Sequence, residues 1–326
     1  MRNTGAWLTR LKTRWLELTL LIGFVGLLVW FGCATAPAVR SLQSTPTPIP
    51  SPIPVLSPTP EARKFDGQVA FQHVQAQMAI GPRPTGSDAG RKTGDYVAEQ
   101  LKRYDWQVEE QDFVYRGVAG RNLIGKAGKG PVAIIGAHYD TRRGADNDPD
   151  PALRAQPVPG ANDGASGVGV LLELARTLDK DRLNNEVWLT FFDAEDNGRL
   201  GGWDFIAGSS DLASRLTVVP EMVVIADMIG DRDQQISKER NSTPELVERI
   251  WAIAARLGYE ETFLPAVKWA MLDDHTPFLE AGIPAADLID FDYPYWHTTQ
   301  DTADKVSAES LERVGRVLEV LVEGQE

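Results

Sequence analysis

The sequence predicts an α/β domain built around an open, largely parallel sheet with helices on both faces. Beyond residue 64, segments with helical periodicity alternate with short, continuously apolar runs. Such runs are typical of strands that are buried on both faces, as they are in a parallel sheet. Residues 64–326 also have the length of one α/β domain of about 260 residues.

The expected elements follow one another in the order that such a sheet requires. We expect strands, some with polar ends, over residues 106–114, 122–126, 131–140, 186–196, 222–231 and 285–289. We expect helices over residues 65–80, 88–104, 164–178, 244–257, 277–281 and 307–322. Ser87 or Asp88 can cap the second of these helices. Residues 141–159 are acidic and proline-rich but lack the full calcium-loop spacing, so we expect a solvated loop there.

The first 63 residues differ from the predicted domain. Residues 1–17 are basic, and residues 18–36 form an uncharged apolar run close to the roughly 20 residues that span a bilayer. The basic flank predicts a cytoplasmic N-terminus, a transmembrane or signal-anchor helix and an extracytoplasmic domain. A cleaved signal peptide with secretion, or a lipoprotein acylated at Cys33, are the alternatives. Residues 37–63 are proline-rich and predict an extended, disordered linker.

Composition excludes several classes of protein. The chain has 33 basic and 46 acidic residues, four histidines and one cysteine. One cysteine cannot form an intrachain disulfide or a cysteine-rich zinc module, and an acidic chain without a basic cluster does not favour nucleic-acid binding. Residues 1–60 hold five basic residues and one acidic residue, so the net charge of −13 combines a basic N-terminus with a remainder at −17. Any metal site must use carboxylates and imidazoles.

Ionisable residues follow four of the expected strands. The carboxyl ends of parallel strands meet at one edge of the sheet, where ligands bind. Several carboxylates at one edge need a cation, and mixed carboxylate and imidazole ligands favour zinc over calcium. The residues concerned are His138, Asp140, Asp193, Glu195, Asp196, Asp227, Asp290, Asp292 and His297, with Asp163 just before a helix.

Six motifs in order carry a family resemblance. They are GAHYDT, GANDGASGVGVLLELA, FFDAED, IADMIG, DDHTPFLEAGIP and YWHTTQDTADKVS. The chain resembles zinc aminopeptidases of the aminopeptidase Y type and the related glutaminyl-peptide cyclotransferases over residues 81–322, with GPRPTGS near the start. The resemblance implies a three-layer α/β/α sandwich with a mostly parallel central sheet, the phosphorylase/hydrolase-like zinc exopeptidase fold, with zinc at the strand ends.

The resemblance implies two alternative sets of metal ligands. In the peptidases, two zinc ions would be held by His138 and Asp227 on one side and by Asp196 and His297 on the other, with Asp163 as the bridge. In the cyclotransferases, one zinc ion would be held by Asp163, Asp196 and His297. One ion is favoured here and two remain possible.

The resemblance also implies catalytic and substrate-binding residues. Glu195 would be the general base of a peptidase, or would carry the proton in a cyclotransferase. In a cyclotransferase Asp227 would bind the substrate amine, and Asp273 would take part in the proton relay. The residues expected to wall the substrate pocket are Trp296, Tyr293 and Trp203.

Several details favour the cyclotransferase branch. Asp196 in FFDAED stands where peptidases usually have glutamate, DDH replaces their Ser-Asp-His, Trp296 replaces their tyrosine, and ADNDPDP resembles a loop of bacterial cyclotransferases. We therefore expect a zinc enzyme that converts the N-terminal glutamine of peptides to pyroglutamate with release of ammonia.

Two alternatives remain. A zinc-dependent aminopeptidase that hydrolyses N-terminal residues is the first. A catalytically inactive extracellular binding domain is the second, and it is disfavoured because each expected site position carries a competent side chain. The sequence predicts no oligomeric state.

Overall fold

The computed structural model describes residues 64–324. The predicted basic N-terminus, membrane segment and linker lie outside these residues. Within residues 64–324, no helix is long and apolar enough to cross a bilayer. Residues 64–324 belong to one compact unit.

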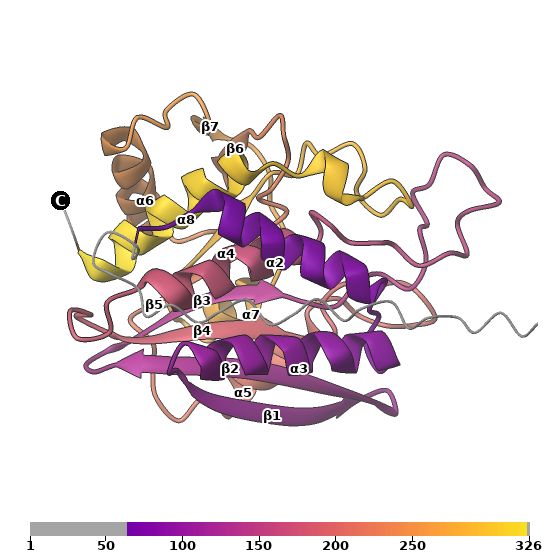
Figure 1. Ribbon diagram of the computed structural model, residues 1–326, viewed down its shortest axis with the longest axis horizontal. Helices are drawn as coiled ribbons and strands as arrows, with labels where there is room; N and C mark the ends of the chain where they lie inside the picture. Colours follow the sequence, from indigo (N-terminus) through magenta and orange to yellow (C-terminus); the bar gives the residue numbers. More distant parts are fainter. Residues whose placement is uncertain (1–63, 325–326) are drawn as a thin grey trace, which may run out of the picture. The chain divides into compact units, whose positions relative to one another are not determined.

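A six-stranded sheet forms the centre of this unit, in the order β1-β2-β4-β3-β5-β8 (Figure 1). The strands are β1 (Gln107–Tyr115), β2 (Val118–Gly128), β3 (Val132–His138), β4 (Glu186–Phe192), β5 (Met222–Asp227) and β8 (Ala285–Ile289). Strands β4, β3, β5 and β8 are mutually parallel, whereas β1 and β2 form an antiparallel hairpin on the β4 side. Both residues of the hairpin turn, Arg116 and Gly117, have positive φ, as a tight two-residue turn requires.

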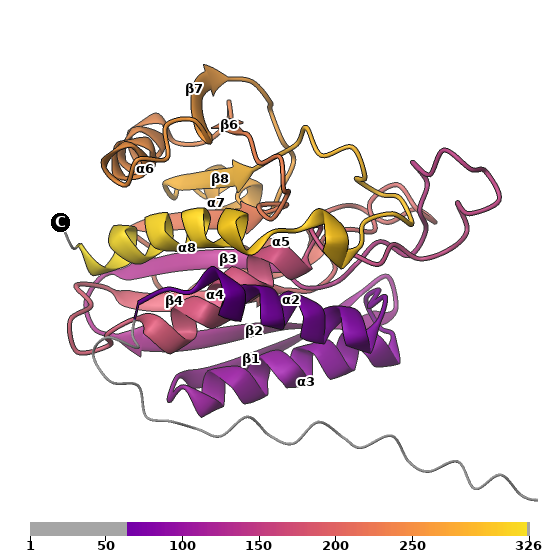
Figure 2. The same ribbon diagram turned by 45° about the horizontal axis from the view of Figure 1, so that its top comes forward.

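Helices cover both faces of this sheet (Figures 1 and 2). One face carries α2 (Gly67–Ile80), α3 (Asp88–Arg103), α4 (Ala165–Thr177), α6 (Pro244–Arg256) and α8 (Ala308–Glu323). The other face carries the short helices α5 (Ala207–Arg215) and α7 (Thr276–Glu280). Along β3, Ala133, Ile135 and Ala137 pack on the first face and Ile134 on the second, which explains its unbroken apolar sequence. The predicted three-layer architecture is confirmed.

The sequence pattern did not predict α5 or the two-stranded sheet of β6 (Ile236–Lys238) and β7 (Phe263–Val267). Helix α5 is largely polar, and it begins after Ile206, a left-handed residue whose side chain cannot cap a helix. Strand β6 has three residues, too few to show a period. The predicted helices and strands otherwise agree with the structure to within a few residues, and Ser87 caps α3 by accepting a hydrogen bond from the Gly90 N–H.

Helix α4 approaches the sheet closely, and this approach positions the loop before it. A Cβ atom on Gly167 would lie 2.1 Å from the carbonyl oxygen of Ala226 in β5. Only glycine allows this distance. The loop that carries Asp163 therefore lies against the carboxyl ends of β3 and β5.

Candidate active site

The first group of ligand-type side chains contains His138, Asp163 and Asp227, all buried. His138 is the last residue of β3 and Asp227 is the last residue of β5, while Asp163 precedes α4. The Nε2 atom of His138 lies 3.1 Å from an oxygen of Asp163 and 3.1 Å from an oxygen of Asp227. The convergence of the strand ends is confirmed for these residues.

The second group contains Asp163, Asp196 and His297, and it shares Asp163 with the first. The Nε2 atom of His297 lies 2.9 Å from Asp196 Oδ1 and 3.7 Å from Asp163 Oδ2. Asp196 belongs to the loop after β4, and His297 to the loop after β8. Three loops thus bring together the three residues that the sequence suggested as ligands of one zinc ion.

The donor atoms of these groups fit a divalent cation. Among the described residues, Asp163 Oδ2 and Asp196 Oδ2 are buried without a hydrogen-bond partner. Burial, with the nearby Asp163 carboxylate, raises the pKa of Asp196 to about 6, and burial, with the nearby Asp273, raises that of Asp227 to about 8. A bound cation would offset both effects by favouring the ionised carboxylates. Carboxylate oxygen and imidazole nitrogen together are ligands that zinc accepts.

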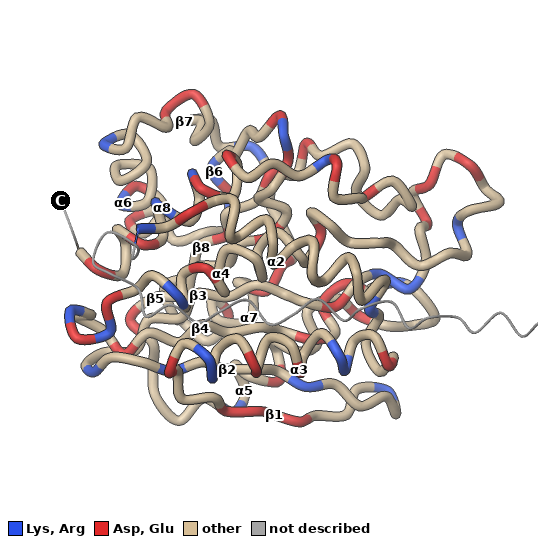
Figure 3. Tube along the Cα trace, in the orientation of Figure 1, with Lys and Arg blue, Asp and Glu red and all other residues tan. Residues whose placement is uncertain are grey.

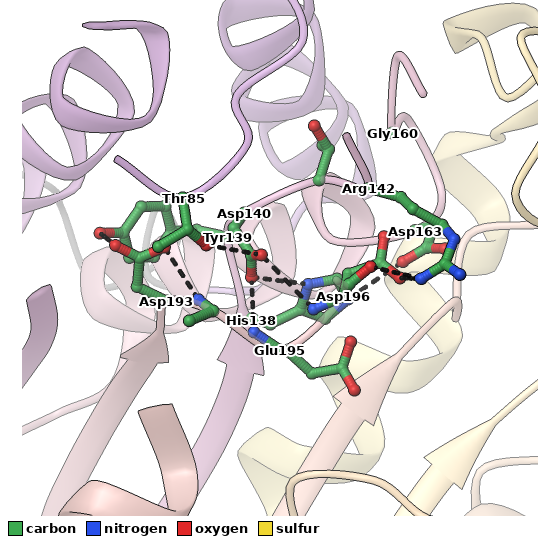
Figure 4. A network of polar contacts seen from close by, with 12 residues as sticks. Thr85, His138, Tyr139, Asp140, Arg142, Gly160, Asp163, Asp193, Glu195 and Asp196 are labelled. Carbon is green, nitrogen blue, oxygen red and sulfur yellow. Dashed lines mark hydrogen bonds and ion pairs between the residues drawn. The ribbon is translucent and has the colours of Figure 1, made fainter. Parts of the chain in front are cut away.

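Asp140 organises the loop after β4 (Figure 4). Its Oδ1 accepts a hydrogen bond from the Glu195 N–H at 3.0 Å, and its Oδ2 accepts from the Thr85 hydroxyl at 3.1 Å and from the Asn197 amide at 3.3 Å. The Asp196 N–H also points at Oδ2, at 3.4 Å. A single carboxylate therefore fixes the backbone of two adjacent site residues.

Glu195 has the properties of a proton carrier. It is buried. Burial, together with the carboxylates of Asp196, Asp274 and Asp273, raises its pKa well above the ordinary value. A carboxyl group with a raised pKa is a stronger base than a free glutamate and can take up a proton and return it, which is what general acid–base catalysis requires.

The sequence pointed to Asp273, and the structure adds its neighbour Asp274. Asp273 is buried, and its carboxylate accepts a hydrogen bond from the Asp274 N–H. Asp274 is fully buried, and neither of its carboxylate oxygens has a hydrogen-bond partner among residues 64–324. The doubled aspartate of the DDH motif was the available signal for this second residue.

The three aromatic residues proposed for the pocket wall lie in different surroundings. Trp296 stacks beside His297 and makes an edge contact with Phe291 at 4.8 Å. Tyr293 is buried in the same cluster, and its hydroxyl donates to Asp301 at 2.7 Å. Trp203 lies in a separate cluster with Phe113. Trp296 and Tyr293 therefore belong to one aromatic cluster beside His297, and Trp203 does not belong to it.

The cluster around Trp203 also contains Phe113, Ala194 and Ala207. The Arg143 guanidinium lies 4.2 Å from the centre of the Trp203 ring. Trp203 is 6% exposed, so this side chain is mostly covered by protein.

The sequence analysis missed two buried arginines at the site. Arg83, in the GPRPTGS segment, donates to the carbonyl oxygens of Tyr139, Pro159 and Gly160 at 2.6–3.0 Å. Burial lowers its pKa to about 10, which leaves it charged at neutral pH. Arg142 donates to the Asp196 carbonyl at 2.8 Å. An arginine in a loop motif gives no sequence signal of such burial.

Acidic residues also occupy the surface. Figure 3 shows them spread over the described elements with basic residues between them. Within the site, the buried carboxylates and two imidazoles together can bind a metal ion, and Glu195 can take up and return a proton.

Comparison with known proteins agrees with this arrangement. The model of Peptidase family M28 matches residues 122–322. A glutaminyl-peptide cyclotransferase of Boiga dendrophila is 26% identical over 288 residues, covering 74% of this chain and 76% of the relative. The crystal structure of Tannerella forsythia glutaminyl cyclase is 31% identical with a TM-score of 0.75, covering 81% of this chain and 100% of that one.

The solved structure of an exopeptidase is similar to this chain to the same degree. A Zn-dependent exopeptidase from Parabacteroides distasonis is 31% identical with a TM-score of 0.75, covering 80% of this chain and 99% of that one. The resemblance predicted from the six motifs is confirmed, and so is an enzyme of one of these two types. The chain belongs to Peptidase family M28.

Proposed function

We propose that this protein is a zinc-dependent glutaminyl-peptide cyclotransferase, which converts an N-terminal glutamine to pyroglutamate and releases ammonia. The observation that carries the proposal is the buried group of Asp163, Asp196 and His297 beside the buried Glu195. Its similarity to glutaminyl cyclases over most of the chain supports it.

The three residues Asp163, Asp196 and His297 would hold the zinc ion. When bound, zinc would polarise the side-chain amide carbonyl of the substrate glutamine as a Lewis acid. Asp227 would accept a hydrogen bond from the α-amine of the substrate and orient the amine toward that carbonyl. Its position at the end of β5, next to the ligands, supports this role.

Glu195 would transfer the proton. It takes the proton of the α-amine as the amine nitrogen attacks the amide carbon, and a new carbon–nitrogen bond closes the ring. It returns that proton to the amide nitrogen as the old carbon–nitrogen bond breaks and ammonia leaves. The buried carboxyl groups of Asp273 and Asp274 help to raise the pKa of Glu195 and would favour its uptake of the proton.

The aromatic side chains around His297 would limit access of water. Trp296 and Phe291 are in contact, and Phe291 also meets the ring of Trp269 at 5.4 Å. Exclusion of water matters because an activated water would hydrolyse a substrate that should cyclise.

The second candidate is a zinc-dependent aminopeptidase. The group of His138, Asp163 and Asp227 favours it, because these residues could hold a second ion that shares Asp163 with the first. Glu195 would then activate a water molecule as general base. The similarity to a Zn-dependent exopeptidase supports this candidate.

One experiment separates the two candidates. The purified protein is incubated with a Gln-initiated peptide and, separately, with a Leu-initiated peptide, and its bound zinc is counted. We expect ammonia and a cyclised N-terminus from the first peptide, no release of leucine from the second, and about one zinc ion per chain. Release of leucine with about two zinc ions would refute the cyclotransferase proposal.

We also propose that residues 18–36 anchor the protein to a membrane and that residues 37–63 link this anchor to an extracytoplasmic enzyme. The uncharged apolar run behind a basic flank supports this proposal. Recovery of the full chain in a salt-washed membrane fraction is the expected result. Recovery of a chain that begins after residue 36 in the medium would contradict it.

A further inference from the structure

The acidic loop, residues 141–159, is largely exposed between residues 146 and 157, as expected from its composition, but a few of its side chains are buried against the protein. Asp148 within it is 1% exposed. The base of the loop is closed by backbone hydrogen bonds from Ala145 to Gln156 at 2.8 Å and from Val158 to Arg142 at 2.9 Å. The acidic loop thus has a defined shape and a face that contacts other residues.

That face contacts the segment around His297. The Asn147 N–H donates to the His297 carbonyl at 3.2 Å, and the Asn147 side-chain amide reaches the Trp296 carbonyl at 3.5 Å. Asp148 Oδ2 accepts hydrogen bonds from the backbone N–H and the hydroxyl of Thr299, at 2.9 and 2.6 Å. The acidic loop therefore binds this segment on both sides of His297.

His297 needs such support because its backbone is strained. Its φ is 57°, in the left-handed region that residues other than glycine rarely adopt. A residue persists in this conformation when its surroundings over-determine it. The hydrogen bonds from Asn147 and to Asp148 supply that constraint on the chain at and after His297.

The acidic loop also faces the side chain of His297. The Nε2 atom of the ring points at Asp196, while its Nδ1 atom lies 3.6 Å from Asp146 Oδ1. Arg142 holds Asp146 through two hydrogen bonds, at 2.6 and 2.9 Å. The same guanidinium donates to the Asp196 carbonyl at 2.8 Å, so one buried arginine is connected to two of the three proposed ligands, Asp196 directly and His297 through Asp146.

We infer that the acidic loop is a positioning element for the metal site, in which Asp146, oriented by Arg142, faces Nδ1 of His297 at 3.6 Å and favours the tautomer with its proton on Nδ1. The proton on Nδ1 leaves Nε2 with its lone pair directed at the metal position. Metal-bound histidines generally need such a partner for their second nitrogen, and its loss typically weakens metal binding about 10- to 100-fold. This inference rests on the proposed function, because it takes His297 to be a zinc ligand.

The test compares zinc binding by Asp146→Ala with that by Asp150→Ala. Asp150 is an exposed acid of the same loop, and its carboxylate accepts only a local hydrogen bond from Ala152 among the contacts described. Both variants lose one negative charge, so they match in net charge. Zinc affinity is measured by competition with a chromophoric chelator, and zinc release by transfer to an excess of chelator.

We expect Asp146→Ala to bind zinc about 10- to 100-fold more weakly and to release it faster, whereas Asp150→Ala stays within about twofold of the wild type. Asp146→Glu restores a carboxylate and should recover most of the affinity. Equal zinc affinities for the two alanine variants would overturn the inference. A weak affinity in Asp146→Ala that Asp146→Glu does not recover, together with a lower thermal midpoint of the zinc-free protein, would also overturn it, because the loop would then have only a structural role.

A third variant separates this inference from the proposed function. His297→Ala should lose the zinc ion that the wild type binds. If His297→Ala binds zinc as tightly as the wild type, the proposed metal site is wrong, and the inference fails with it. If His297→Ala loses zinc but Asp146→Ala does not, the metal site stands and only the role of the acidic loop is refuted.

Discussion

We expect His73 to make the stability of the protein depend on pH, independently of the metal site. It lies on α2, buried, and its Nδ1 is 2.5 Å from the hydroxyl of Tyr96, while its Nε2 has no hydrogen-bond partner among residues 64–324. Burial, with the nearby positive charges of Arg103 and Arg176, lowers the pKa of His73 from 6.5 to about 4. The perturbation is the replacement of this histidine by glutamine, which is polar and does not titrate.

The sign and size of the effect follow from this pKa. Above pH 6.5 the imidazole of His73 is neutral in both the folded and the unfolded chain, so it adds no pH dependence. Between pH 6.5 and about 4 the unfolded chain binds a proton that the folded chain does not, so the free energy of unfolding falls as the pH falls. A difference of this size corresponds to roughly 3 kcal/mol over the whole window, at about 1.4 kcal/mol for each pKa unit.

The assay is urea unfolding of the wild type and of His73→Gln at several pH values from 7.5 to 4.5. Other groups titrate in this range, among them Glu173, but they are common to both proteins and largely cancel in the difference. We expect the free energy of unfolding of the wild type to fall by about 2–3 kcal/mol relative to that of His73→Gln between pH 7.5 and pH 4.5. A difference that is constant to within about 0.5 kcal/mol would refute the reasoning, because His73 would then titrate alike in both states.

Two more predictions concern the site and its support. Glu195→Gln should lower turnover about 100- to 10,000-fold and leave zinc bound, because we propose that Glu195 carries the proton and is not a ligand. Loss of zinc in this variant, measured by metal analysis, would contradict that role. Gly167→Ala should lower the free energy of unfolding by about 1–3 kcal/mol, because the new methyl group collides with the Ala226 carbonyl and moves α4 away from β5. An unchanged urea midpoint for Gly167→Ala would show that this close approach is unimportant.

The sequence predicted the sheet well because buried parallel strands leave a strong pattern. Strand β3 is buried at each of its seven residues and reads as a continuous apolar run, and β8 was predicted at its observed bounds. Every residue of such a strand is buried and apolar, so the position of the strand can be read from a continuous apolar run in the sequence. The antiparallel edge and the small second sheet carry weaker patterns, because many of their side chains are exposed.

The proposed ligands could be predicted because they follow strands, whose ends converge in any parallel sheet. The supporting residues could not, because they depend on loop conformations. Arg142 lies in a segment that the sequence predicts to be a solvated loop, yet its guanidinium is buried and bonded to two loop carbonyls and a carboxylate. The left-handed conformation of His297 likewise has no signature in the residue itself.

The buried carboxyl groups of the site differ in the direction in which their pKa values are shifted. Although burial opposes it, His138 lowers the pKa of Asp163, which therefore stays ionised and available as a ligand. Burial, together with the nearby Asp273, raises the pKa of Asp274 and of Asp287 well above the ordinary value. Glu195 is next to Asp196 in the chain and senses both Asp196 and Asp274. It therefore interacts both with a proposed metal ligand and with a buried carboxyl group of raised pKa, a setting that suits the role we propose for it, taking a proton from the substrate and returning it.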